Sequence, residues 1–293
     1  MRSEKEMLDL ILNNAREDNR IRAVIMNGSR VNPNTPKDFF QDFDIVYLVT
    51  DVKPFTRNFD WIKRFGELMI LQTPEDMQDP PPGDDSFYSY LMQFKDGNRI
   101  DLGIFPVTQA VKIYSDSLTI VLLDKDNVIP PLPPPDDRDY LPKPPTKKAF
   151  NDCCNEFWWV CPYAAKGLWR GEIIYAKQMI DVYIREQLNK MLNWYIGITT
   201  GDQKNPGKYG KYYERYLTTE LWELLLRTYS DAGYELTWDA LLSMGELFRT
   251  VAIPVADHFG FQYPWMDDRN VTAHLMHVHS LPRDAKEMYQ AKF

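Results

Sequence analysis

The chain has 293 residues, of which 44% are hydrophobic and 14% aromatic, and its formal net charge at pH 7 is -8. This length allows two modest domains with buried cores, and the composition excludes an intrinsically disordered chain. The acidic balance disfavours a non-specific grip on nucleic acid, and no apolar run approaches the roughly 20 residues of a membrane helix. We therefore expect a monomeric cytoplasmic protein with neither nucleic acid nor a membrane as its partner.

The N-terminal segment predicts an amphipathic helix. Charged residues are dense in "MRSEKEMLDLILNNAREDN", and Ser3 is placed to cap a helix that follows it. The segment has no apolar stretch of the kind that marks a signal peptide. The three cysteines, Cys153, Cys154 and Cys161, include no C-x-x-C pair, so we expect reduced and mostly buried thiols.

The rest of the first half predicts a small sheet. Apolar and β-branched residues gather in five short runs, and Asp96-Gly97 supplies a hairpin turn between the third and the fourth. In chain order the expected elements are strands at 22–27 and 42–49, a helix at 56–68, strands at 86–94 and 99–105, and a strand at 118–124. This order predicts an α+β domain over residues 1–129, with helices on one face of a mixed sheet.

A proline-rich segment separates this region from a helical one. Residues 130–146 include "PPLPPPDDRDYLPKPP", which cannot form a helix or a central strand, so we predict an extended linker. Residues 147–293 then show apolar residues at three- and four-residue spacing, which predicts an α-helical bundle. The expected helices cover 148–172, 173–196, 218–229 and 237–259, the last with Thr237 as its N-cap.

Two aspartates at the start of a strand are the main candidates for chemistry. Side chains alternate across a strand, so Asp42 and Asp44 point the same way, while Phe43 points the other way. Two carboxylates so placed offer the hard oxygen ligands that Mg²⁺ prefers, and a cation would offset their repulsion. A D-x-D pair beside a loop is also common as a merely solvated feature, so the surrounding sequence must support the metal interpretation.

The context of the pair favours the metal interpretation. Asp101 is an isolated acid in a later apolar strand and would complete a cluster of three if that strand lay beside residues 42–49. Gly28 and Ser29 follow an earlier strand, where backbone amides and a hydroxyl can hold a triphosphate, and Arg30 can add a charged contact.

This pattern resembles the nucleotidyltransferase superfamily with the DNA polymerase β-like fold. Over nearly the whole chain the sequence further resembles the aminoglycoside 6-adenylyltransferases. The stretches that carry this likeness are "MRSEKEM", "GSR", "PKDFFQDFDI", "PEDM", "RIDLGIFP", "LLDKDN", "DCCNEFWWV", "KGLWRGE", "NWYIGI", "YYERYL" and "DDRNVT".

The resemblance implies Mg²⁺-dependent transfer of AMP from ATP to the 6-hydroxyl of streptomycin, with release of pyrophosphate and antibiotic resistance as the outcome. It implies that Asp42 and Asp44 hold Mg²⁺ against the triphosphate. Asp101 either joins the metal ligands or takes the hydroxyl proton as general base, the role we favour. A lysine beyond the linker should meet the outer phosphates; Lys177 is the first candidate and Lys166 the second.

Streptomycin carries two guanidinium groups, so its pocket should offer carboxylates and aromatic faces. Glu156, Trp159 and Glu172 are the candidates, although a tryptophan more often packs in a core. Two other functions remain open. The same fold could transfer a nucleotide to a protein side chain or an RNA end, or it could bind nucleotide without catalysis. The second requires a broken carboxylate set, whereas all three aspartates are intact.

Overall fold

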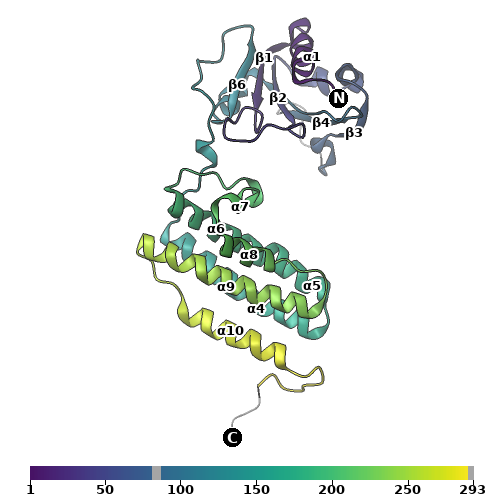
Figure 1. The fold of residues 1–293 in the computed structure, drawn as a ribbon. Coiled ribbons are helices and arrows are strands. Elements are labelled where there is room, and N and C mark those ends of the chain that lie inside the picture. Colours follow the sequence, from purple (N-terminus) through teal and green to yellow (C-terminus); the bar gives the residue numbers. More distant parts are fainter. Residues whose placement is uncertain (81–86, 290–293) are drawn as a thin grey trace. The chain divides into compact units, whose positions relative to one another are not determined.

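The computed structural model describes residues 1–80 and 87–289 of the chain (Figure 1). The chain divides into two compact units, Met1–Asp139 and Tyr140–Phe293. The division falls inside the 130–146 segment, whose prolines disfavour regular structure on both sides of it.

The first unit is built on a six-stranded mixed sheet with the order β3-β4-β5-β2-β1-β6. Strands β2 and β5 pair in parallel, and the other neighbours are antiparallel. The strands are β1 (Ile21–Asn27), β2 (Phe43–Val49), β3 (Leu68–Gln72), β4 (Tyr88–Phe94), β5 (Arg99–Pro106) and β6 (Thr119–Asp124). The expected α+β class is confirmed, as is the β4–β5 hairpin. Ser86, the first residue of the strand expected at 86–94, lies outside the described residues.

Both faces of the sheet are covered. Helix α1 (Glu4–Glu17) begins at the expected Ser3 cap and packs Met7 and Ile11 against one face. The opposite face has its own smaller core, in which helix α3 (Ala110–Tyr114) contributes Ala110. The expectation of helices on one face only is therefore wrong. The reason is visible in β1, where Ala23 and Val24 are both fully buried, as residues of a central strand covered on both sides must be.

The helix expected at 56–68 is replaced by shorter elements. Helix α2 (Lys53–Thr56) precedes a 3-10 helix, η1 (Phe59–Phe65), and strand β3 begins at Leu68. Gly66 has a φ of 135°, a conformation that other residues rarely adopt, and it ends η1. The remaining short elements are the 3-10 helices η2 (Pro74–Met77) and η3 (Val107–Gln109).

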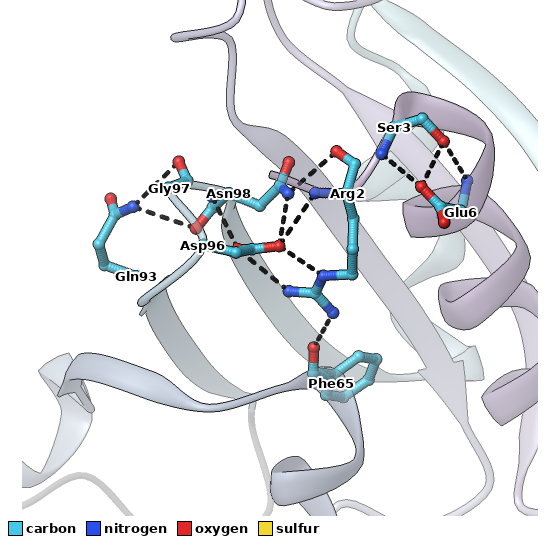
Figure 2. A network of polar contacts seen from close by, with 8 residues as sticks. All are labelled: Arg2, Ser3, Glu6, Phe65, Gln93, Asp96, Gly97 and Asn98. Atoms are coloured by element: carbon cyan, nitrogen blue, oxygen red, sulfur yellow. Dashed lines mark hydrogen bonds and ion pairs between the residues drawn. The ribbon is translucent and has the colours of Figure 1, made fainter.

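A polar clamp ties the start of the chain to the β4–β5 turn (Figure 2). The Arg2 Nε donates to Asp96 Oδ2 at 2.7 Å, and its Nη1 donates to the Phe65 carbonyl at 2.5 Å. The Asn98 side chain donates to the Arg2 carbonyl at 3.1 Å and to Asp96 at 3.0 Å. The clamp lowers the pKa of Asp96, chiefly through its hydrogen bond with Arg2. It therefore fixes the turn that leads directly into β5.

The second unit is helical, as expected. Its elements are η4 (Arg138–Tyr140) at the boundary, then α4 (Lys147–Arg170), α5 (Ile173–Gln178), a π-helical turn η5 (Met179–Ile184), α6 (Arg185–Thr200), η6 (Lys208–Gly210), α7 (Tyr213–Tyr216), α8 (Thr219–Arg227), α9 (Tyr234–Phe259) and α10 (Trp265–Ser280). Its core includes Trp158, whereas the neighbouring Trp159 is 62% exposed. The three cysteines are free and buried, which confirms the prediction for the thiols.

Two features of this unit differ from the prediction. Thr237 is not an N-cap: α9 begins at Tyr234, and the buried Thr237 hydroxyl donates to the Gly233 carbonyl at 2.7 Å. A threonine hydroxyl can accept from the first N–H groups of a helix as an N-cap, or donate to the carbonyl four residues earlier inside a helix. Its presence alone therefore does not show where the helix begins. Helix α10 was not among the expected helices, because its apolar residues are sparse. Among the helices within the described ranges, none combines the length and apolar character that crossing a bilayer requires.

Candidate active site

Strand register brings the predicted carboxylates together in the first unit. Asp44 on β2 lies directly beside Asp101 on the parallel strand β5. Phe43 and Ile45 point into the core that α1 covers, so Asp44 points to the opposite face. Asp42, two residues earlier, lies just before β2 on that same face. The three aspartates therefore share one face at one end of the two central strands.

An arginine lies among these carboxylates. The Arg99 guanidinium contacts Asp101 at two points, from Nε to Oδ1 at 2.7 Å and from Nη2 to Oδ2 at 2.8 Å. Its Nε also lies 3.5 Å from Asp42 Oδ2. Arg99 and Asp101 are two residues apart on β5, so alternation puts both on the same face. The guanidinium thus bridges two of the three predicted site residues.

The charges around Asp44 are not balanced. Burial, together with the negative charges of Asp101 and Asp42, raises the pKa of Asp44 to about 6. Burial also raises the pKa of Asp42, although Arg99 opposes that rise. Two guanidinium groups, those of Arg99 and Arg30, oppose the charges of three carboxylates, so this end of the sheet lacks positive charge.

Gly28 packs directly against the Asp44 carboxylate. A Cβ atom at position 28 would lie 2.1 Å from Asp44 Oδ2, and the residue has a φ of 77°. Both facts require glycine at this turn. The sequence predicted that Gly28 lets phosphates approach the backbone; what it makes room for here is the carboxylate. Ser29 follows it, and within the described residues its hydroxyl makes no hydrogen bond.

Arg30 holds the loop between β1 and β2. Its Nη2 donates to the Gln41 carbonyl at 2.5 Å, its Nε donates to the Asp42 carbonyl at 3.2 Å, and its guanidinium stacks 3.8 Å from the Phe43 ring centre. The Gln41 side chain in turn donates to the Ser29 carbonyl at 3.1 Å. These contacts position Asp42 relative to the Gly28–Ser29 turn, and the predicted phosphate contact of Arg30 would have to be made alongside them.

The predicted residues of the second unit lie on α4 and at α5. Glu156 and Trp159 are exposed on α4, and Glu172 is exposed at the start of α5. The Lys177 ammonium donates to the Ser230 carbonyl at 2.8 Å and lies 3.0 Å from Asp181 Oδ2. Lys166, the second candidate, is exposed and lies 5.1 Å from the Tyr163 ring centre. Their roles toward substrate stay predictions.

Two polar residues of the first unit were not anticipated. Arg99 is the first, although the R-x-D spacing on a strand already indicated that it shares a face with Asp101. Glu75 is the second: it is 5% exposed, and it accepts hydrogen bonds from the Ser89 amide and hydroxyl at 2.9 and 3.1 Å. Glu75 lies in the stretch "PEDM" that carries the family resemblance, but its residue type alone does not indicate burial, because an acid in a short 3-10 helix is ordinarily solvated.

The first unit has donors that suit a divalent cation. Asp42 and Asp44 offer hard oxygens, and the raised pKa of Asp44 marks a place where positive charge is stabilising. In the part of the chain that the structure describes, no three His, Cys, Asp or Glu side chains are already arranged to hold one metal ion together. The two-point contact of Arg99 with Asp101 gives a physical reason, because it keeps the third carboxylate facing a guanidinium.

The mixed sheet, the Gly-Ser turn and the carboxylates on two parallel strands define the first unit as a nucleotidyltransferase domain of the DNA polymerase β-like kind. A family model described as streptomycin adenylyltransferase matches residues 1–278. The chain belongs to that family, and it is a nucleotidyltransferase.

Individual relatives agree with this assignment. The aminoglycoside 6-adenylyltransferase of Bacillus subtilis (strain 168) is 43% identical over 270 residues, which cover 92% of this chain and 95% of that protein. The enzyme of the same name from Campylobacter jejuni is 44% identical over 92% of this chain and 93% of its own length. A crystal structure of an aminoglycoside 6-adenyltransferase from Bacillus subtilis covers 96% of this chain and 100% of that chain, at 37% identity and a TM-score of 0.47.

Proposed function

We propose that this enzyme transfers AMP from ATP to the 6-hydroxyl of streptomycin, releases pyrophosphate, requires Mg²⁺ and thereby confers resistance to the antibiotic. The observation that carries the proposal is the pairing of Asp44 with Asp101 in register, with Asp42 on the same face and the Gly28–Ser29 turn against Asp44. Membership of the streptomycin adenylyltransferase family supports the choice of acceptor.

Asp42 and Asp44 are the residues that would hold Mg²⁺. Bound there, the metal would supply positive charge that offsets the charge building on the phosphates during transfer. The Ser29 hydroxyl, which has no partner within the described residues, is available to donate to a phosphate oxygen. Arg30 orients this turn through its contacts with the loop that ends at Asp42.

Asp101 acts as the general base in this proposal. It accepts the proton of the streptomycin hydroxyl while the hydroxyl oxygen bonds to the α-phosphorus and the bond from that phosphorus to pyrophosphate breaks. The alternative role, as a third metal ligand, is less favoured, because the guanidinium bonded to both of its oxygens would repel a metal ion bound to the same carboxylate, whereas a neutral hydroxyl is not repelled. An ionised carboxylate held in one orientation suits proton transfer, which depends on geometry first.

The second unit would contribute the remaining contacts. Lys177 would meet the outer phosphates, for which its ammonium would have to leave Asp181 and the Ser230 carbonyl. Glu156, Trp159 and Glu172 are exposed and offer the carboxylates and aromatic face that two guanidinium groups would recognise.

The direct test measures pyrophosphate release from ATP with and without streptomycin and Mg²⁺. We expect release only when both are present, and a loss of about a thousandfold in Asp42→Asn. Full activity of Asp42→Asn, or full activity in EDTA, would contradict the metal assignment. Expression of the gene in a sensitive bacterium should raise streptomycin tolerance, and the Asp42→Asn gene serves as its control.

A screen of acceptors with labelled ATP tests the alternative. If AMP moved to a protein side chain or an RNA end and not to streptomycin, the fold assignment would stand and the proposed acceptor would be wrong.

A further inference from the structure

Arg99 occupies the position among the carboxylates where a cation is needed. Its guanidinium contacts Asp101 at 2.7 and 2.8 Å and lies 3.5 Å from Asp42 Oδ2. The Arg99 side chain is 40% exposed, so one side of the guanidinium faces solvent and has room to move. The two contacts differ in strength, because the pair with Asp101 is short and two-pointed, whereas the pair with Asp42 is single and long.

A divalent cation on Asp42 and Asp44 would compete with this arrangement. Asp42 Oδ2 cannot face both a guanidinium and a metal ion at close range, since the two cations would repel each other within a few ångströms. The weaker Arg99–Asp42 contact is the one that metal entry would break. The two-point contact with Asp101 would survive, because its distances of 2.7 and 2.8 Å are shorter than the 3.5 Å to Asp42 and its second bond uses Nη2, which the Asp42 contact does not involve.

We propose that Arg99 is a built-in counter-ion, which neutralises Asp42 and Asp101 in the metal-free enzyme, gives up Asp42 when Mg²⁺ enters, and keeps Asp101 out of the metal-ligand set. Arg99 is thus a positioning residue for Asp101 and a determinant of metal affinity. The inference rests on the proposed function, because it takes Asp42 and Asp44 as the metal ligands.

The sheet explains why an arginine can do this. Arg99 begins β5 immediately after the turn that the Arg2–Asp96 clamp fixes, so its backbone is held at the edge of the cluster. From there its side chain reaches Asp101 on its own strand and Asp42 just before the neighbouring strand. The fork of the guanidinium matches the carboxylate of Asp101, which a lysine ammonium cannot do.

The test measures Mn²⁺ binding to the nucleotide-free protein by calorimetry, with Mn²⁺ standing in for Mg²⁺. We expect Arg99→Gln to bind Mn²⁺ about tenfold more tightly than wild type, because the competing charge is gone. Arg99→Lys keeps the charge and should stay within about threefold of wild type. Arg22→Gln is the matched control: it breaks the Arg22–Asp126 ion pair elsewhere in the same unit, and its Mn²⁺ affinity should not change.

Thermal unfolding gives a second readout that does not depend on activity. In EDTA, Arg99→Gln removes the two-point partner of Asp101 and leaves Arg30 as the remaining cation near the carboxylates, so its Tm should fall below that of wild type. Added Mg²⁺ should then raise the Tm of Arg99→Gln more than it raises the Tm of wild type. Equal rises in Tm for the two proteins would overturn the proposal. So would an Arg99→Gln variant that binds Mn²⁺ no more tightly than wild type, or an Arg99→Lys variant whose Mn²⁺ affinity rises as much as that of Arg99→Gln.

Asp44→Asn separates this inference from the proposed function. If wild type binds Mn²⁺, Asp44→Asn does not, and Arg99→Gln brings no gain, only the role of Arg99 is wrong. If wild type and Asp44→Asn bind Mn²⁺ equally, or neither binds, the metal assignment fails and the exchange at Arg99 fails with it.

Discussion

The two units differ in how they present the residues expected to act. In the sheet unit, Asp42, Asp44 and Asp101 come together because strand alternation and parallel register fix both their face and their level. In the helical unit, Glu156 and Trp159 are exposed on α4, and Lys177 on α5 forms an ion pair with Asp181. Alternation along a strand therefore predicts which side chains lie next to each other. Helical periodicity predicts only which side chains are buried and which are exposed.

The largest effect should come from the sheet unit. Asp44→Asn removes a predicted metal ligand and should lower kcat/KM by about a thousandfold, or about 4 kcal/mol of transition-state stabilisation. Steady-state release of pyrophosphate measures it, and Asp126→Asn, on the same unit but away from the cluster, should leave it unchanged. A loss smaller than tenfold would mean that the cluster is not the chemical centre.

The helical unit should show its largest effect in stability. Asp268 is 1% exposed and accepts hydrogen bonds from Arg249 at 2.6 Å and from Tyr263 at 2.8 Å. Asp268→Ala leaves Arg249 unpaired and should lower the free energy of unfolding by about 3 kcal/mol. Denaturant titration measures this change, and the exposed neighbour substitution Asp267→Ala should change it by less than about 1 kcal/mol.

At a temperature where Asp268→Ala is still folded, its kinetic constants should match those of wild type. A collapse of kcat in the folded variant would place chemistry in the helical unit and would break the contrast between the units.

Gly28→Ala should lower kcat/KM by about a hundredfold. The added methyl group would meet Asp44 Oδ2 and the φ of 77° would be strained, so the carboxylate must shift, and small displacements at a reacting centre have effects of this size. Gly201→Ala is the matched control, because its φ is 63° but a Cβ there meets nothing within 4 Å. Gly201→Ala should lose about 1 kcal/mol of stability with normal kinetics; equal activity losses in both variants would point to backbone strain alone.

The smallest effect should distinguish two exposed apolar side chains of the helical unit, Trp159 and Met276. Trp159→Ala should raise the KM for streptomycin about fivefold while leaving the KM for ATP unchanged, since loss of a cation–π contact is worth about 1 kcal/mol. Stability should change by less than about 0.5 kcal/mol, because Trp159 is 62% exposed. Met276→Ala, at 60% exposure on α10, is the control. An unchanged KM for streptomycin would remove Trp159 from the pocket.

The sequence predicted the strands of the site and the shared face of Asp42 and Asp44, because a period of two is a strong local rule. It did not predict β3, a short edge strand with Met69 and Ile70 each 63% exposed, since the pattern there lacks a buried face. It also missed Arg99 as a partner of the carboxylates. The pairing of β2 with β5 joins residues far apart in the sequence, so it cannot be predicted from local patterns. The contact of Arg99 with Asp42 depends on that pairing.

The Arg2 clamp has a practical consequence for anyone who produces this enzyme. Arg2 fastens the turn ahead of β5, so a fusion tag, a cloning scar or a substitution ahead of Ser3 acts on the strand that carries Asp101. Such an extension would need a spacer that leaves the Arg2 amide free to reach Asp96. Two preparations that differ only in their N-terminal extension should be compared for their dependence on Mg²⁺ before their turnover numbers are compared.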